Sequence, residues 1–126
     1  MPSQQGIRWI ATINNYDDDL EQHLADISDN GEKIRYAIIA REIGESGTKH
    51  LQCFFIFRKP KRLRAVRELL SPRGHYELVR GTAEQARDYC KKDGDYDEHG
   101  DFDGQQGKRN DLSECFTWAK QFETDS

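Results

Sequence analysis

The chain has 126 residues, of which 35% are hydrophobic and 33% are charged, so its length suits one compact domain with a modest core and excludes two. It contains no run of about 18 apolar residues, which excludes a membrane-spanning helix, and residues 1–6 lack the basic and apolar stretches of a secretory signal. The net charge of −4 argues against a nucleic-acid-binding protein unless the basic residues gather in one region.

The three cysteines, Cys53, Cys90 and Cys115, are an odd number and show no CxxC spacing. This pattern favours free thiols in a reducing compartment over a disulfide framework or a zinc site.

The first half of the chain predicts a strand, a helix and a β-hairpin. Residues 7–13 are rich in β-branched and aromatic side chains, as strands are. Residues 17–30 open with acidic side chains and carry apolar ones at helical spacing, which predicts a helix. Residues 34–42 and 50–57 predict two strands, which the turn at residues 44–48 joins into a hairpin.

The second half predicts a helix, a short strand and another helix. We expect Pro60 to end the second hairpin strand, because proline donates no hydrogen bond to a sheet. Residues 63–70 place apolar side chains on one helical face, and residues 75–79 predict a short strand. Residues 82–85 read as a capping box that opens a helix ending at Gly94.

The composition shifts after residue 96. Residues 97–107 are rich in Asp and Gly, which predicts a loop or linker, and residues 111–122 predict a terminal helix. We therefore expect one domain in residues 1–96, with its core at about 7–95, and a linker in residues 97–126.

The order strand–helix–strand–strand–helix–strand–helix predicts an α+β fold, an antiparallel β-sheet with flanking helices close to the split βαβ arrangement. The spacing of the elements does not determine the order of the strands in the sheet.

The charge is unevenly distributed along the chain. Residues 58–67 hold six basic side chains and no acidic one, whereas residues 93–103 hold six acidic side chains and no Lys or Arg. The basic segment, with Arg62 and Arg64, is a candidate for contacts with DNA phosphates. The alternative is a solvated helix face.

A candidate metal site lies in the predicted hairpin. His50 and Gln52 are two residues apart on a strand, so their side chains share a face. Glu42 ends the partner strand, and the turn can bring it close to His50. One carboxylate and two neutral ligands suit a catalytic Mg²⁺ or Mn²⁺. The alternative is a set of polar residues on a solvated face. We also expect His50→Ala or Gln52→Ala to weaken metal binding and leave the fold intact, because a solvated face tolerates such changes within ~0.5 kcal/mol.

Tyr89 and Lys92 form a second candidate pair. Both lie on the last predicted helix, three residues apart, so we expect their side chains to share a face. A tyrosine hydroxyl is a poor nucleophile at neutral pH, and a nearby cation or a metal-bound electrophile helps it react. The alternative is an amphipathic tyrosine at the edge of the core.

Taken together and in this order, these motifs resemble those of the replication initiator proteins of small circular single-stranded DNA viruses, members of the HUH endonuclease superfamily. The first family motif is matched by Ala-Thr-Ile-Asn-Asn at residues 11–15. The second is matched by residues 47–52, preceded by residues 41–45, and the third by residues 88–94. The resemblance covers residues 7 to about 95, and circovirus-like sequences look most similar.

The resemblance implies roles for these side chains. Glu42, His50 and Gln52 would bind the metal, Mn²⁺ or Mg²⁺. Tyr89 would attack phosphorus to form a 5′-phosphotyrosine and release a 3′-hydroxyl. Lys92 would position the phosphate or stabilise the developing charge.

The resemblance also implies partners and a location. Thr12, Asn14 and Asn15 would lie near single-stranded origin DNA in a stem-loop. The family's helicase domain is missing, and residues 107–112 resemble the linker that leads into it, so we expect the N-terminal part of a longer protein that forms oligomers only with that domain. The expected location is the host nucleus.

Two other functions remain open at this point. One is a non-catalytic RRM-like module that binds single-stranded nucleic acid by stacking and charge. The other is a protein-interaction domain with an acidic tail, which explains none of the three motifs. A binding module needs neither metal ligands nor a nucleophile, so these residues separate it from an enzyme.

Overall fold

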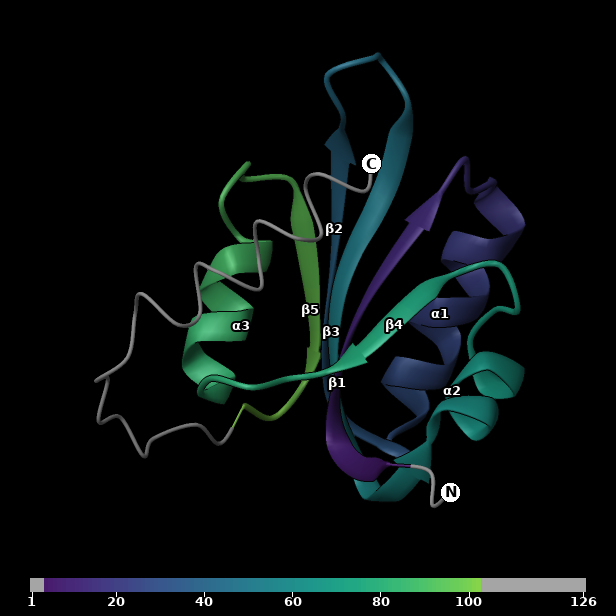
Figure 1. Cartoon of the computed structure of the whole chain (residues 1–126), viewed down its shortest axis with the longest axis vertical. Coiled ribbons are helices and arrows are strands. Elements are labelled where there is room, and N and C mark those ends of the chain that lie inside the picture. Colours follow the sequence, from purple (N-terminus) through teal and green to yellow (C-terminus); the bar gives the residue numbers. More distant parts are fainter. Residues whose placement is uncertain (1–3, 103–126) are drawn as a thin grey trace.

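The computed structural model describes residues 4–102, which form a five-stranded antiparallel sheet and three helices (Figure 1). Across the sheet the strands run in the order β4-β1-β3-β2-β5. Helices α1 and α2 cover one face and α3 covers the other. This arrangement confirms the predicted α+β class. The elements are β1 (Gln5–Asn14), α1 (Asp18–Asn30), β2 (Ile34–Ile43), β3 (Lys49–Arg62), α2 (Leu63–Leu69), β4 (His75–Leu78), α3 (Ala83–Cys90) and β5 (Tyr96–Gly100).

Both ends of the first predicted helix and the start of the last one are confirmed. The Asp17 side chain caps α1 by accepting a 2.9 Å hydrogen bond from the Leu20 backbone N–H. Gly31 ends the helix at φ 76°, a left-handed conformation that glycine adopts without a steric penalty. Thr82 and Gln85 form the predicted capping box of α3, at 3.0 Å in each direction.

Side chains of β3 alternate between two cores, one on each face of the sheet. Leu51, Cys53 and Phe55 point toward α1 and α2. Phe54 points the other way, into the core under α3, where Cys90 is also buried. Because Cys53 faces α1 and α2, it faces away from His50 and Gln52, as its alternation with Gln52 predicts. Cys53 and Cys90 are both buried free thiols.

The prediction that Pro60 ends the strand is wrong, because β3 continues to Arg62. Its register with β1 shifts where Gly6 pairs with Lys61 and Arg8 pairs with Ile56. Pro60 falls within this irregular stretch, where a missing backbone N–H costs no regular pairing.

The loop predicted from residue 97 is also wrong at its start, because residues 96–100 form the edge strand β5. β5 pairs with β2, and the Tyr36 hydroxyl donates a 2.6 Å hydrogen bond to Glu98. A solvated edge strand needs few apolar side chains, so composition alone suggested a loop. The remaining linker from residue 103 and the terminal helix predicted at 111–122 lie outside the described residues, and the domain boundary at residue 96 stays a prediction.

The last predicted helix is shorter than expected. α3 ends at Cys90, and Lys92 lies in the turn that follows, so the expectation that Tyr89 and Lys92 share a helix is wrong. Within residues 4–102, no helix is long and apolar enough to cross a membrane.

Candidate functional site

Polar residues of three neighbouring strands line up on the α3 face at one end of the sheet. Asn14 of β1 pairs with His50 of β3, which on its other side pairs with Glu42 of β2. One step further into the sheet, Thr12 pairs with Gln52. Residues directly opposite each other in an antiparallel sheet project from the same face, so the strand register alone brings these five side chains together.

The β2–β3 turn fixes this register. The Gly44 N–H donates to the Thr48 carbonyl oxygen at 2.8 Å, and the Gly47 N–H donates to the Gly44 carbonyl oxygen at 2.9 Å. Gly47 has φ 88°, which favours glycine. The turn closes two residues beyond Glu42 and thereby sets it opposite His50.

Glu42 is the charged centre of the site. Its Oε1 lies 3.1 Å from His50 Nε2, and its Oε2 accepts a 2.7 Å hydrogen bond from Lys92 Nζ. The Glu42 side chain is only 5% exposed. Burial alone would raise the pKa of Glu42, but the hydrogen bonds from His50 and Lys92 outweigh burial and hold that pKa below its usual value. The carboxyl group is therefore ionised at neutral pH.

The Gln52 amide is held by two hydrogen bonds. Its Nε2 donates to the Ala11 carbonyl oxygen at 3.2 Å, and its Oε1 accepts from the Thr12 hydroxyl at 3.3 Å. Gln52, His50 and Glu42 are all buried, at 2%, 6% and 7% exposure. The alternative of a solvated sheet face is therefore wrong for these residues.

The donor set fits a divalent metal. It offers a carboxylate oxygen, an imidazole nitrogen and an amide oxygen, which Mg²⁺ and Mn²⁺ accept. The 3.1 Å between His50 Nε2 and Glu42 Oε1 is close to the separation of about 2.8–3.0 Å between adjacent ligands of an octahedral Mg²⁺. His50 Nδ1 is a buried polar atom without a hydrogen-bond partner among the described residues. No cluster of three or more His, Cys, Asp or Glu suited to a metal occurs in residues 4–102, so any metal there would rely on the Gln52 amide.

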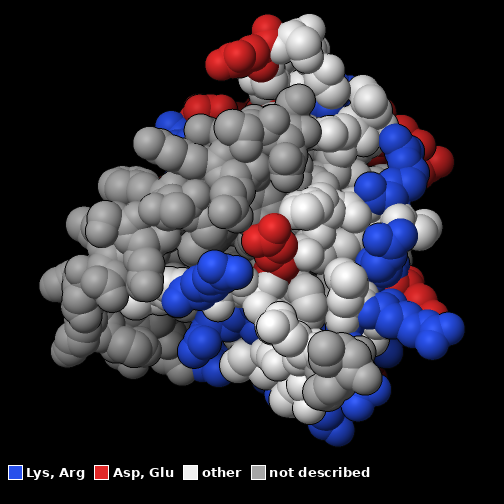
Figure 2. Space-filling view, in the orientation of Figure 1, with Lys and Arg blue, Asp and Glu red and all other residues white. Residues whose placement is uncertain are grey.

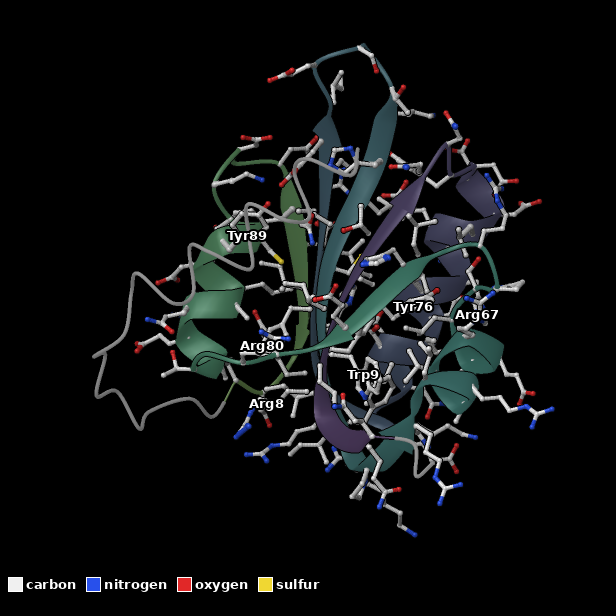
Figure 3. The ribbon with its side chains drawn as sticks, viewed as in Figure 1. Arg8, Trp9, Arg67, Tyr76, Arg80 and Tyr89 are labelled. Atoms are coloured by element: carbon white, nitrogen blue, oxygen red, sulfur yellow. The ribbon has the colours of Figure 1, made fainter. Side chains whose placement is uncertain are left out.

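Tyr89 and Lys92 reach the same end of the sheet from α3 and from the turn that follows it. Tyr89 is in the last turn of α3 (Figure 3) and is half-buried against the core under that helix. Lys92 Nζ lies 4.3 Å from the centroid of the Tyr89 ring. Lys92 therefore contacts both the tyrosine and Glu42, although it is not in the helix.

The residues expected to contact DNA fall into two separate groups. Thr12 and Asn14 lie beside Gln52 and His50, and Asn15 follows them at φ 54°. Arg62 and Arg64 lie at the far end of β3 and in α2, so a path along the strand from His50 to Arg62 is roughly 35–40 Å. Figure 2 shows Lys and Arg side chains gathered over the edge of the molecule where α2 lies.

Two arginines that hold the site together were missed by the sequence analysis. Arg41 forms ion pairs with Glu21 at 2.6 Å, Asp95 at 2.9 Å and Asp97 at 3.0 Å, which tie α1 and the segment after α3 to β2. Arg73 donates to the backbone oxygens of Asn14 and Asn15, at 3.2 and 3.3 Å. Their partners are 20 to 59 residues away in sequence, so no local pattern could have indicated these contacts.

Comparison with known proteins gives one family and several relatives. The family described as "Putative viral replication protein" matches residues 6–93. The chain is similar to the replication-associated protein of Beak and feather disease virus, with 41% identity over 98 residues, 75% of this chain and 33% of that protein. It is similar to the replication-associated proteins of Canary circovirus, with 39% identity over 70% of this chain and 29% of that protein, and of Porcine circovirus 2, with 34% identity over 84% and 33%. The chain thus spans about a third of the length of these relatives.

Proposed function

Because the chain belongs to the viral replication protein family, we propose that it is a metal-dependent endonuclease that nicks and rejoins single-stranded DNA at a viral replication origin. The similar circovirus proteins are named replication-associated, which supports a role in viral DNA replication by the rolling-circle route. The nicking chemistry that we propose is inferred from the side chains of this chain.

The observation that carries the proposal is the meeting of two groups of side chains. Glu42, His50 and Gln52 come from neighbouring strands, and Tyr89 with Lys92 comes from α3 and its following turn. The contact between Lys92 and Glu42, at 2.7 Å, joins the two groups. A buried carboxylate beside a lysine and a tyrosine suits phosphoryl transfer.

In the proposed reaction, the Tyr89 hydroxyl oxygen attacks a backbone phosphorus. A bond forms between that oxygen and phosphorus, the bond from phosphorus to the 3′ oxygen breaks, and the strand leaves with a 3′-hydroxyl. The phenol loses its proton and the leaving oxygen gains one. The 3′-hydroxyl can attack the resulting 5′-phosphotyrosine, which rejoins the strand.

Glu42, His50 and Gln52 would hold Mn²⁺ or Mg²⁺, which when bound supplies positive charge to the phosphate under attack. Lys92 would add a second positive charge beside the Tyr89 ring. Thr12, Asn14 and Asn15 would contact the strand next to this centre, and Arg62 and Arg64 would contact DNA farther away. We also propose that the chain is part of a longer protein with a helicase domain. Oligomers would form only with that domain, and the protein would act in the host nucleus.

The non-catalytic binding module has lost its main support. An RRM-like surface needs exposed aromatic rings on which bases stack, and Phe54, Phe55 and Phe57 are all fully or almost fully buried. These three rings belong to the two cores.

The test of the proposal is a covalent adduct. Incubation with Mn²⁺ and a labelled single-stranded origin oligonucleotide should give a labelled protein band that survives denaturation. Tyr89→Phe should abolish the band while it leaves DNA binding measurable, because only the hydroxyl is removed. Tyr76→Phe is the matched control, since the Tyr76 hydroxyl donates a 2.6 Å hydrogen bond to the Ser71 carbonyl oxygen. A band of wild-type intensity from Tyr89→Phe would refute the assignment of the nucleophile.

A further inference from the structure

Lys92 occupies an unusual position for a residue expected to bind a phosphate. Its ammonium group lies 2.7 Å from Glu42 Oε2 and 4.3 Å from the centroid of the Tyr89 ring. The other oxygen of the same carboxylate lies 3.1 Å from His50 Nε2. The ammonium is therefore already paired with a group that the proposed function gives to the metal.

One buried carboxylate would then serve two cations. The Glu42 side chain is 5% exposed and that of Lys92 is 31% exposed, so water screens the charges at Glu42 poorly. A divalent ion bound to Glu42 would draw electron density from the carboxylate and repel the nearby ammonium. Each cation therefore weakens the hold of the carboxylate on the other.

We propose that Lys92 is the resident counter-cation of Glu42, that a divalent metal competes with it for the carboxylate, and that metal binding thereby frees the ammonium for the DNA phosphate. This inference rests on the proposed function and deepens it. Lys92 becomes a positioning residue that acts through Glu42 before substrate is bound. Metal and DNA then bind cooperatively, since each favours the state in which Lys92 has left Glu42, and this coupling is reciprocal.

The first test measures metal affinity without DNA. Binding of Mn²⁺ to the 126-residue protein is followed by the electron paramagnetic resonance signal of the free ion. Lys92→Met should bind Mn²⁺ at least about tenfold more tightly than the wild type, equivalent to about 1.4 kcal/mol, because a hydrogen bond to a charged group is lost from the competing state. An unchanged or weaker affinity overturns the proposal.

Lys91→Met is the matched control. Lys91 is the adjacent residue, is 30% exposed and pairs with Glu98 at 3.7 Å instead of Glu42. Its substitution removes the same charge from the same turn but leaves the contact between Lys92 and Glu42 in place, so it should change the Mn²⁺ affinity by less than about twofold. Equal tightening in both variants would show a general charge effect and would overturn the competition.

The second test measures the release of the lysine. In a Tyr89→Phe background, which prevents cleavage, the affinity for a single-stranded oligonucleotide is measured with and without Mg²⁺ at constant ionic strength. Adding Lys92→Met should weaken DNA binding with Mg²⁺ present and have little effect without it. A loss of equal size under both conditions overturns the release.

The two tests also separate this inference from the proposed function. Saturable Mn²⁺ binding that His50→Ala removes, together with no effect of Lys92→Met, overturns only the inference. If the wild-type protein shows no saturable Mn²⁺ binding, the metal-dependent function and the inference both fail.

Discussion

The burial of Gln52 predicts a structural cost for a substitution that a solvated face would tolerate. Gln52→Ala removes an amide that is 2% exposed and that bonds the Ala11 carbonyl oxygen and the Thr12 hydroxyl, at 3.2 and 3.3 Å. Leaving buried polar groups without their partner costs ~1–3 kcal/mol, and the space left by the removed atoms adds to it. We therefore expect the free energy of unfolding to fall by about 2–3 kcal/mol.

The assay is equilibrium urea unfolding of the metal-free protein, followed by tryptophan fluorescence and by circular dichroism. Asn14→Ala is the control, because Asn14 lies on the same face but is exposed, and exposed positions usually change stability by less than ~0.5 kcal/mol. If Gln52→Ala also changes the free energy of unfolding by less than ~0.5 kcal/mol, the assignment of the Gln52 amide as buried and hydrogen-bonded is wrong. Since a domain has only ~5–15 kcal/mol of stability, metal affinity in this variant must be measured under conditions where it is folded.

Two further predictions concern charge. The double substitution Arg62→Gln and Arg64→Gln should reduce the slope of the logarithm of the DNA-binding constant against the logarithm of salt concentration, by up to ~0.7 per lost phosphate contact on single strands. The effect should appear only with oligonucleotides long enough to span the roughly 35–40 Å from His50. An unchanged slope on long DNA would place these arginines away from the DNA. The pKa of Glu42 is held below its usual value in the folded protein, so its contribution to stability is fully present above the unfolded pKa of about 4.3 and is lost as the pH falls through the lower folded value. Urea unfolding of the metal-free protein between neutral and acidic pH should therefore show a fall in the free energy of unfolding that the Glu42→Gln variant lacks. Parallel plots of the free energy of unfolding against pH for the two proteins would contradict this prediction.

The sequence predicted the local elements and the proximity of Glu42 and His50 better than it predicted the burial of these residues. A hairpin with a short glycine-containing turn has few possible registers, so the proximity of Glu42 and His50 followed from local spacing. Strand alternation also placed Gln52 on the face opposite Cys53, as observed. These inferences needed only residues within about a dozen positions of one another.

Long-range contacts could not be predicted in this way. Glu42 and Lys92 are 50 residues apart in sequence, and only the placement of α3 over the sheet brings them together. The period of a strand shows which side chains share a face but not whether a helix covers that face, so burial of the site was missed. The acidic strand β5 was missed because backbone pairing with β2 stabilises it and its composition does not.

The position of Asn14 leads to a prediction about sequence choice. Asn14 is exposed and lies directly opposite His50, so a strand whose phosphate reaches Tyr89 would pass within reach of its side-chain amide. An amide can both donate to and accept from a base edge, as Asn does with adenine, whereas contacts to phosphate oxygens carry no sequence information directly. We expect Asn14→Ala to reduce the ratio of single-turnover cleavage rates between a matched and a scrambled oligonucleotide more than it slows cleavage of the bound matched strand. Loss of a base contact is worth about 1–3 kcal/mol, or roughly a factor of 5 to 150 in that ratio. Fully paired origin DNA should be cleaved poorly by both proteins, because pairing buries the base edges. If Asn14→Ala retains the wild-type ratio, the sequence is recognised by other residues.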